Sequence, residues 1–132
     1  AHRMAVAIMG DTGRSPADSL DDFSSFYFDT ALSSSAAALP TLLAFAKPGH
    51  ITFGSDFPFA PLAAGKLFAA GLESYPHLDT SALQAIERTN ALALFPRLGT
   101  APPPPARSLL DSARTTASRM AMRGLVRLIG TR

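Results

Sequence analysis

Short apolar stretches alternate with polar turns along the first 95 residues of the chain. Apolar residues that recur every three or four positions are typical of helices, and short aromatic or β-branched runs between turn residues are typical of strands. The pattern predicts strands over 25–30 and 50–54, and helices over 1–10, 16–23, 36–47, 62–72 and 81–95. Strands that alternate with helices at this spacing indicate βαβ units and a parallel sheet, so the predicted fold class is α/β.

Two features suggest that the predicted α/β segment, residues 1–95, is part of a larger structure. Two strands are too few for an independent sheet, because a parallel pair leaves both of its edges open. The chain also opens with Ala1 inside an apolar helical pattern, which we interpret as a sign of truncation. We therefore expect a piece of a larger α/β sheet or barrel, and the open edges make pairing with a second copy, as a homo-oligomer, a reasonable expectation.

The pattern changes after residue 99. Four consecutive prolines, 102–105, predict an extended polyproline II spacer over 100–107. The remainder, 108–132, is a basic tail that is either helical or disordered. In a helix, Arg119, Arg123 and Arg127 would form one stripe, whereas the apolar residues of the tail do not gather on one tidy face. The stripe could meet anionic lipid or nucleic acid, or be an ordinary solvated face, and the tail could equally be an extension without a role.

Composition narrows the function classes. Residues 1–100 carry six basic and nine acidic side chains, a net charge of −3, whereas 101–132 carry six arginines and one acid, a net charge of +5. The net negative charge of residues 1–100 therefore argues against nucleic-acid binding by this part of the chain. The absence of cysteine excludes disulfides and thiolate chemistry, and no apolar run reaches the length of a membrane helix. We expect a cytoplasmic protein.

The segment after the second strand is the most informative for chemistry. In parallel α/β sheets, ligands gather beyond the carboxyl ends of the strands, and Asp56 lies just past the strand over 50–54. Gly54 lets the backbone bend closely there. An aspartate at this place can bind a hard cation, act as a general base or simply be a turn or cap residue, and the spacing alone leaves these alternatives open.

Three segments together resemble a known family. They are Ser-Phe-Tyr-Phe-Asp-Thr-Ala at 25–31, Gly-Ser-Asp-Phe-Pro-Phe at 54–59 and Thr-Asn-Ala-Leu-Ala-Leu-Phe at 89–95. In this order they resemble the C-terminal part of metal-dependent amidohydrolase-related proteins. The most similar branch is that of the aminocarboxymuconate-semialdehyde, resorcylate and methylsalicylate decarboxylases, and the resemblance covers about residues 1–98.

The resemblance implies that residues 1–99 form the last two βα units of a TIM (β/α)8 barrel. It implies that Asp56 is a catalytic residue and a ligand of zinc or a similar divalent ion. Phe57 and Phe59 would line the substrate pocket beside Pro58, and Asp29 would either line the pocket or cap the loop that follows it. The implied activity is decarboxylation of a small aromatic carboxylate, with hydrolysis of a C–N or C–C bond as the alternative.

The sequence also departs from the family pattern. The paired His-x-His of the first barrel strand is absent, and His2, His50 and His77 do not match the family's ligand positions. A catalytic metal needs three or more protein ligands, so we expect the chain to be inactive by itself. A second hypothesis is a non-catalytic half-barrel binding protein that is anchored by its basic tail.

Overall fold

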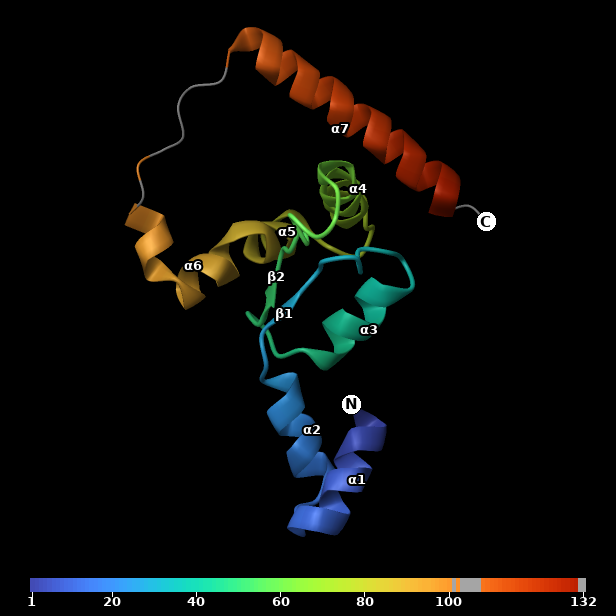
Figure 1. Cartoon of the computed structure of the whole chain (residues 1–132), viewed down its shortest axis with the longest axis vertical. Helices are drawn as coiled ribbons and strands as arrows, with labels where there is room; N and C mark the ends of the chain where they lie inside the picture. Colours follow the sequence, from blue (N-terminus) through green and yellow to red (C-terminus); the bar gives the residue numbers. More distant parts are fainter. Residues whose placement is uncertain (101, 103–107, 131–132) are drawn as a thin grey trace.

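The computed structural model describes residues 1–100, 102 and 108–130, with side chains as far as Leu128. This part of the chain is mostly helical, with two short parallel strands (Figure 1). The strands are β1 (Phe28–Asp29) and β2 (Ile51–Thr52). The α-helices are α1 (His2–Thr12), α2 (Pro16–Ser24), α3 (Ala38–Phe45), α4 (Leu62–Glu73), α5 (Thr80–Gln84), α6 (Asn90–Leu94) and α7 (Leu109–Gly130). A π-helical turn occupies Ala85–Thr89, and a 3-10 helix occupies Pro96–Thr100.

The two strands form the predicted parallel pair, in which Phe28 lies opposite Ile51 and Asp29 opposite Thr52. α3 crosses between them, so the βαβ order expected from the sequence is confirmed. Backbone bonds from Phe28 N to His50 O (2.9 Å) and from Thr30 N to Thr52 O (3.0 Å) flank the ladder. Both strands are nevertheless shorter than the predicted runs over 25–30 and 50–54.

The outer edge of β2 explains where this strand ends. Ile51 O accepts a hydrogen bond from Asn90 Nδ2 at 2.8 Å, and Phe53 N donates to Ile86 O at 2.8 Å. Alternate residues of a strand direct their backbone groups to opposite edges, so these are the groups that a further strand would pair with. The expectation that both edges of the pair stay open is therefore wrong for β2, because a helical segment occupies its outer edge.

The helix predicted over 81–95 forms from Thr80 to Leu94, but its winding changes at this contact. Asp79 caps its start, accepting from Ala82 N at 2.7 Å, but the middle forms the π-helical turn. There Asn90 N bonds Ala85 O, five residues back, instead of Ile86 O. The Ile86 carbonyl is thereby free to accept from Phe53, and the wider turn is what lets the helix close the edge of the sheet.

A small apolar core surrounds β2. Its buried residues are Leu39 of α3, Ile51 of β2, Leu72 of α4 and Ile86 of the π-helical turn. Half-buried side chains pack around them, namely Leu42, Leu43, Ala46, Phe53, Tyr75, Leu78 and Leu83. The core therefore packs the π-helical turn at Ala85–Thr89 against the second strand.

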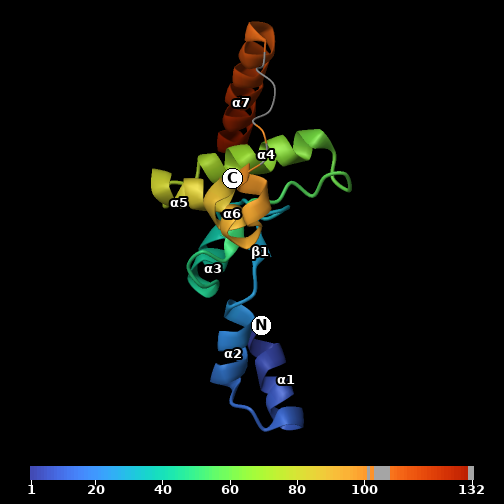
Figure 2. The same ribbon diagram turned by 90° about the vertical axis from the view of Figure 1, so that its left-hand side faces the viewer.

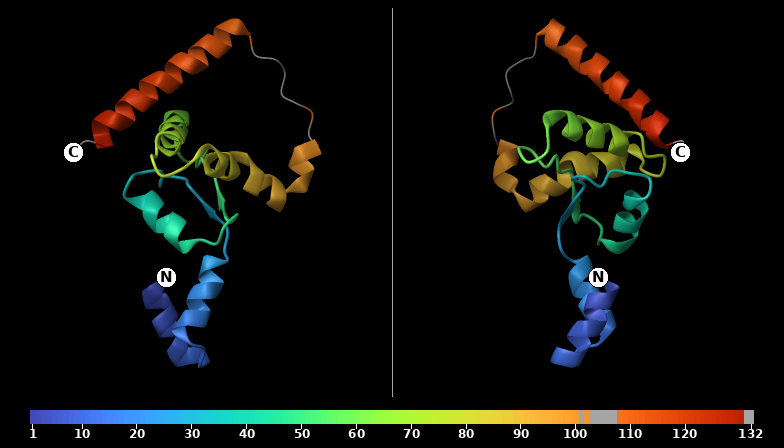
Figure 3. Two further views of the ribbon diagram at one scale, coloured as in Figure 1. Left: turned by 180° about the vertical axis from the view of Figure 1, so that it is seen from behind. Right: turned by 45° about the vertical axis from the view of Figure 1, so that its right-hand side comes forward.

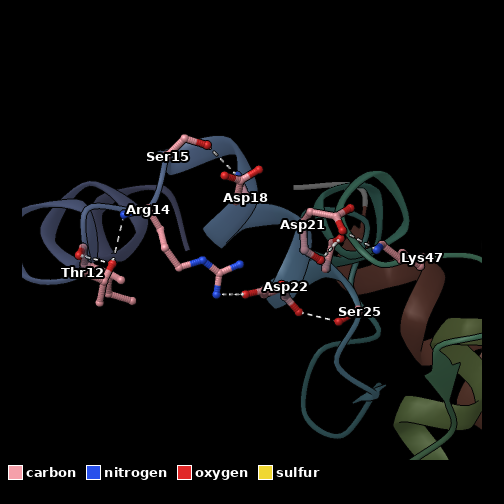
Figure 4. Close-up of polar contacts among 10 residues, drawn as sticks. Thr12, Arg14, Ser15, Asp18, Asp21, Asp22, Ser25 and Lys47 are labelled. Carbon is pink, nitrogen blue, oxygen red and sulfur yellow. Dashed lines mark hydrogen bonds and ion pairs between the residues drawn. The ribbon is translucent and has the colours of Figure 1, made fainter.

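α1 and α2 form a hairpin that projects from this core (Figure 2). Ser15 caps α2, because its Oγ accepts from Asp18 N at 3.1 Å. Polar contacts hold the hairpin (Figure 4): Arg14 pairs with Asp22 at 2.7 Å, and Lys47 reaches Asp21 at 2.8 Å. Lys47 follows α3, so the second of these pairs links the hairpin to the βαβ unit.

The tail forms the helix α7 in this structure. α7 lies across α4 in each view (Figure 1, Figure 3). Arg123 Nη2 pairs with Glu73 Oε2 at 2.6 Å, and Arg119 Nε lies 4.0 Å from Glu73 Oε1. The predicted polyproline spacer falls mostly on residues 101 and 103–107, which lie outside the described residues. Among the helices that the structure describes, none is both long and apolar enough to cross a membrane.

Candidate functional site

The carboxyl ends of β1 and β2 meet at one edge of the sheet, where Asp29 packs on Gly54. Asp29 Oδ1 accepts a hydrogen bond from Ala31 N at 2.8 Å, so its side chain caps the loop after β1. A Cβ atom on Gly54 would lie only 2.7 Å from the same oxygen and 2.8 Å from Cγ. Only glycine leaves room for the Asp29 carboxyl group at this point.

Asp56 lies in a tight loop two residues farther on. Its φ is 56°, in the left-handed region that aspartate tolerates better than most residues. Its carbonyl accepts from Ala60 N at 2.7 Å, and Phe57 N donates to Ser55 Oγ at 3.3 Å. The backbone of Asp56, and not its carboxyl group, therefore makes the turn.

The carboxylate of Asp56 is half-buried, and within the described ranges no hydrogen bond or ion pair engages it. The Asp56 side chain is thus neither a helix cap nor part of a structural ion pair among the described residues, and the N-cap position of α4 is Pro61. Such a carboxylate retains its oxygen lone pairs for a cation, a substrate proton or water.

The two phenylalanines predicted to line a pocket lie on the surface. Phe57 is 66% exposed and Phe59 is 91% exposed. By contrast, Asp29 borders an open hollow of about 1090 Å³, together with Tyr27, Phe28 and Phe45. Asp56 is not among the residues that line this hollow. The structure therefore places Asp29 at an open hollow, and it leaves Phe57 and Phe59 exposed.

The three histidines occupy separate places. His50 precedes β2, at the opposite end of the strand from Asp56, where its Nδ1 lies 2.7 Å from Ser25 O and its ring stacks on Tyr27 at 4.4 Å. His77 packs edge-on against Tyr75, and His2 begins α1. Among the described residues, no group of three or more histidine, aspartate or glutamate side chains could hold a metal ion.

Two residues that support the site were not singled out from the sequence. Asn90 and Ile86 bond the outer edge of β2 and so hold the strand from which the Asp56 loop departs. The signal was present, because Asn90 stands in the Asn-Ala-Leu-Ala-Leu-Phe segment that carries the family resemblance. Its hydrogen-bond partner lies 39 positions earlier in the chain, which no local pattern shows.

Comparisons with known proteins establish the class to which this arrangement belongs. The model of the amidohydrolase family matches residues 9–97, so the chain belongs to the amidohydrolase family. Proteins of this family are typically metal-dependent, and the family implies that the two strands and their helices are a portion of a TIM barrel. No solved structure matches the chain.

Fungal decarboxylases are similar to the chain over 75 to 89 residues. A 6-methylsalicylic acid decarboxylase of Penicillium expansum is 44% identical over 89 residues, which are 67% of this chain and 25% of that protein. The 6-methylsalicylic acid decarboxylase acuB of Aspergillus aculeatus is 49% identical over 75 residues, 55% of this chain and 22% of that protein. The chain thus spans about a quarter of the length of the curated relatives it matches.

Proposed function

We propose that residues 1–99 supply the last two βα units of a metal-dependent barrel that decarboxylates a small aromatic carboxylic acid. Similarity to proteins named as 6-methylsalicylic acid decarboxylases supports the reaction and the substrate class. The observation that carries the proposal is the unengaged Asp56 carboxylate, four residues beyond the end of the second of two parallel strands. In this proposal residues 100–107 are a spacer, and residues 108–132 are a helical addition.

In the assembled barrel, Asp56 would act as a catalytic residue and as one ligand of a divalent ion, for which zinc is the leading candidate. Zinc accepts carboxylate oxygen, but a catalytic site needs three protein ligands. The described residues do not provide them, so they do not fit a metal by themselves. The isolated chain is accordingly expected to lack activity.

Asp29 and Gly54 would set the shape of this site. Their contact fixes the distance between the carboxyl ends of β1 and β2, from which the Asp56 loop departs. The side chain of Asp29 also faces the open hollow, so it would contact or orient substrate there. Phe57 and Phe59 would serve as pocket walls only once further parts of a barrel cover them, because both are exposed here.

The second candidate, a binding protein anchored through the arginine stripe, is less well supported. Arg119 and Arg123 are turned toward Glu73 of α4, so two of the three stripe residues are engaged within the chain. Hydrolysis of a C–N or C–C bond remains the alternative reaction, since the family as a whole is named for amidohydrolases.

A chimera tests the proposed function. The matched quarter of the Penicillium expansum relative is replaced by residues 9–97 of this chain, and decarboxylation of 6-methylsalicylate is measured with zinc present. We expect the chimera to be active and Asp56→Asn to lower kcat/KM by at least a hundredfold, because the amide removes the anionic ligand.

Asp11→Asn is the matched control, since Asp11 is exposed at the end of α1, in the hairpin that projects from the core. It should leave the rate unchanged. A folded chimera that hydrolyses amides but does not release CO2 would support the alternative reaction. Full activity of the Asp56→Asn chimera would refute the role of Asp56.

A further inference from the structure

A cleft of about 370 Å³ lies between α4 and α7, where the tail helix crosses the body of the chain (Figure 1). Each helix supplies one wall. Cavities that bind small molecules measure about 300–1,000 Å³, so the volume of the cleft suits a compact ligand. None of its lining residues belongs to the Asp56 loop or borders the hollow beside Asp29. Binding in the cleft therefore does not depend on the proposed decarboxylation.

The two acidic side chains that line the cleft have partners within the chain. Glu73 Oε2 pairs with Arg123 Nη2 at 2.6 Å, and Arg119 Nε lies 4.0 Å from Glu73 Oε1. Asp111 Oδ2 accepts a hydrogen bond from Ser108 Oγ at 2.8 Å, in the first turn of α7. A carboxylate in the first turn of a helix is also stabilised by the helix dipole. Neither acid is paired with the other basic side chains of the cleft.

Two basic side chains of the cleft have no such partner. Lys66 lines it from α4, and Arg114 lines it from α7. Within residues 1–100, 102 and 108–128, no ion pair or hydrogen bond engages either of them. Cations on the two walls make the electrostatic potential in the cleft positive, and a positive cleft concentrates anions. The half-buried Ser118 also lines the cleft and offers a hydroxyl donor.

Apolar side chains complete the lining. They are Ala69, Ala70 and Met122, of which Ala70 is only 3% exposed and Met122 is half-buried. An inorganic anion would leave this surface in contact with water, whereas an anion with an apolar body would cover it. A guanidinium group binds a carboxylate through two parallel hydrogen bonds. Charge and lining together therefore select an organic acid.

We propose that the cleft binds a small organic acid. Its carboxylate meets Lys66 and Arg114, and its apolar ring or short chain covers Ala69 and Met122. The two cations come from different helices, so the ligand bridges the body and the tail of the chain.

Isothermal titration calorimetry of the whole chain tests the proposal, with benzoate as the probe at low ionic strength, where exposed charges are least screened. We expect saturable binding at one site per chain. Lys66→Gln and Arg114→Gln should each raise the dissociation constant at least fivefold, because each removes one cation that meets the carboxylate. Both side chains are exposed and glutamine is a good helix former, so both variants should keep their helix content, which circular dichroism measures.

Arg127→Gln is the matched control, because Arg127 is exposed on α7 but does not line the cleft. It removes one positive charge from the same helix and should change the dissociation constant less than twofold. Benzyl alcohol has the ring without the charge, and inorganic phosphate has charge without the ring. Each should bind at least tenfold more weakly than benzoate.

Three results would overturn the proposal. The first is the absence of benzoate binding up to about 10 mM. The second is a loss of affinity in Arg127→Gln as large as that in Arg114→Gln, since the attraction would then come from the net charge of the tail and not from the cleft. The third is binding of phosphate or benzyl alcohol as tight as that of benzoate.

Discussion

Gly54 and Asp29 lie against each other at the carboxyl edge of the sheet. The aspartate has two partners there: the Ala31 amide, which it accepts from, and the bare Cα of Gly54, on which its carboxyl group lies. The loop that carries Asp56 begins immediately after this contact. A change at Gly54 therefore acts on the site without removing any functional group.

Gly54→Ala is expected to destabilise the chain by about 1–3 kcal/mol, because the added methyl group overlaps the Asp29 carboxyl group and forces it to move. Urea unfolding of both proteins measures the difference. The Asp29→Ala/Gly54→Ala double variant should lose less than the sum of the two single losses, since the smaller side chain relieves the overlap. Strict additivity would show that the two residues do not press on each other.

At the scale of the elements, β2 is held on both edges, by β1 on one side and by the helical segment Ala85–Leu94 on the other. Asn90 and Ile86 bond one edge of β2, and residues 28–30 bond the other edge. The apolar run and the flanking glycines predicted a strand, but they did not determine its length. The predicted helix over 81–95 is helical from Thr80 to Leu94, but its middle is a π-helical turn, which forms where the edge of β2 needs an acceptor.

Asn90→Ala is expected to lower the free energy of unfolding by about 1–3 kcal/mol, because it leaves the carbonyl of buried Ile51 without its donor. Hydrogen exchange gives a local measure: the Phe53 amide, which donates to Ile86 O, should exchange faster. Gln84→Ala, an exposed change six residues earlier, should alter neither quantity. Unchanged protection of Phe53 in the Asn90 variant would mean that the edge of β2 is held by other contacts.

For the molecule as a whole, the family-like body and the helical tail are joined at Glu73. This residue belongs to the last turn of α4 and receives Arg123, which lies 50 positions later in the sequence. The net charges of the two parts are −3 and +5. These charges are compatible both with attraction between the two parts and with an external anionic partner, so the sequence did not choose between them. In the structure, α7 contacts α4, and its Arg123 pairs with Glu73 of the same chain.

Glu73→Gln is expected to loosen α7 from α4 while leaving the body folded. The stability change should be about 1 kcal/mol or less, since both arginines are at least half exposed to solvent. Fluorescence transfer between dyes on α4 and α7 should fall, and added salt should produce the same fall in the wild-type chain. Glu87→Gln serves as the control, and equal transfer in the two variants would show that apolar contacts alone hold α7.

The sequence by itself determined the order of the elements, most of the helix starts and the family. It could do so because caps such as Ser15 and Asp79 act within one helical turn, and because Gly-Ser-Asp-Phe-Pro-Phe is a contiguous segment. The tertiary structure alone decided what Asp29, Asn90 and Glu73 touch, which edge of the sheet is closed and which side of α7 faces α4. These depend on contacts between residues that are distant in the chain, and the free energy of such contacts has no counterpart in local periodicity.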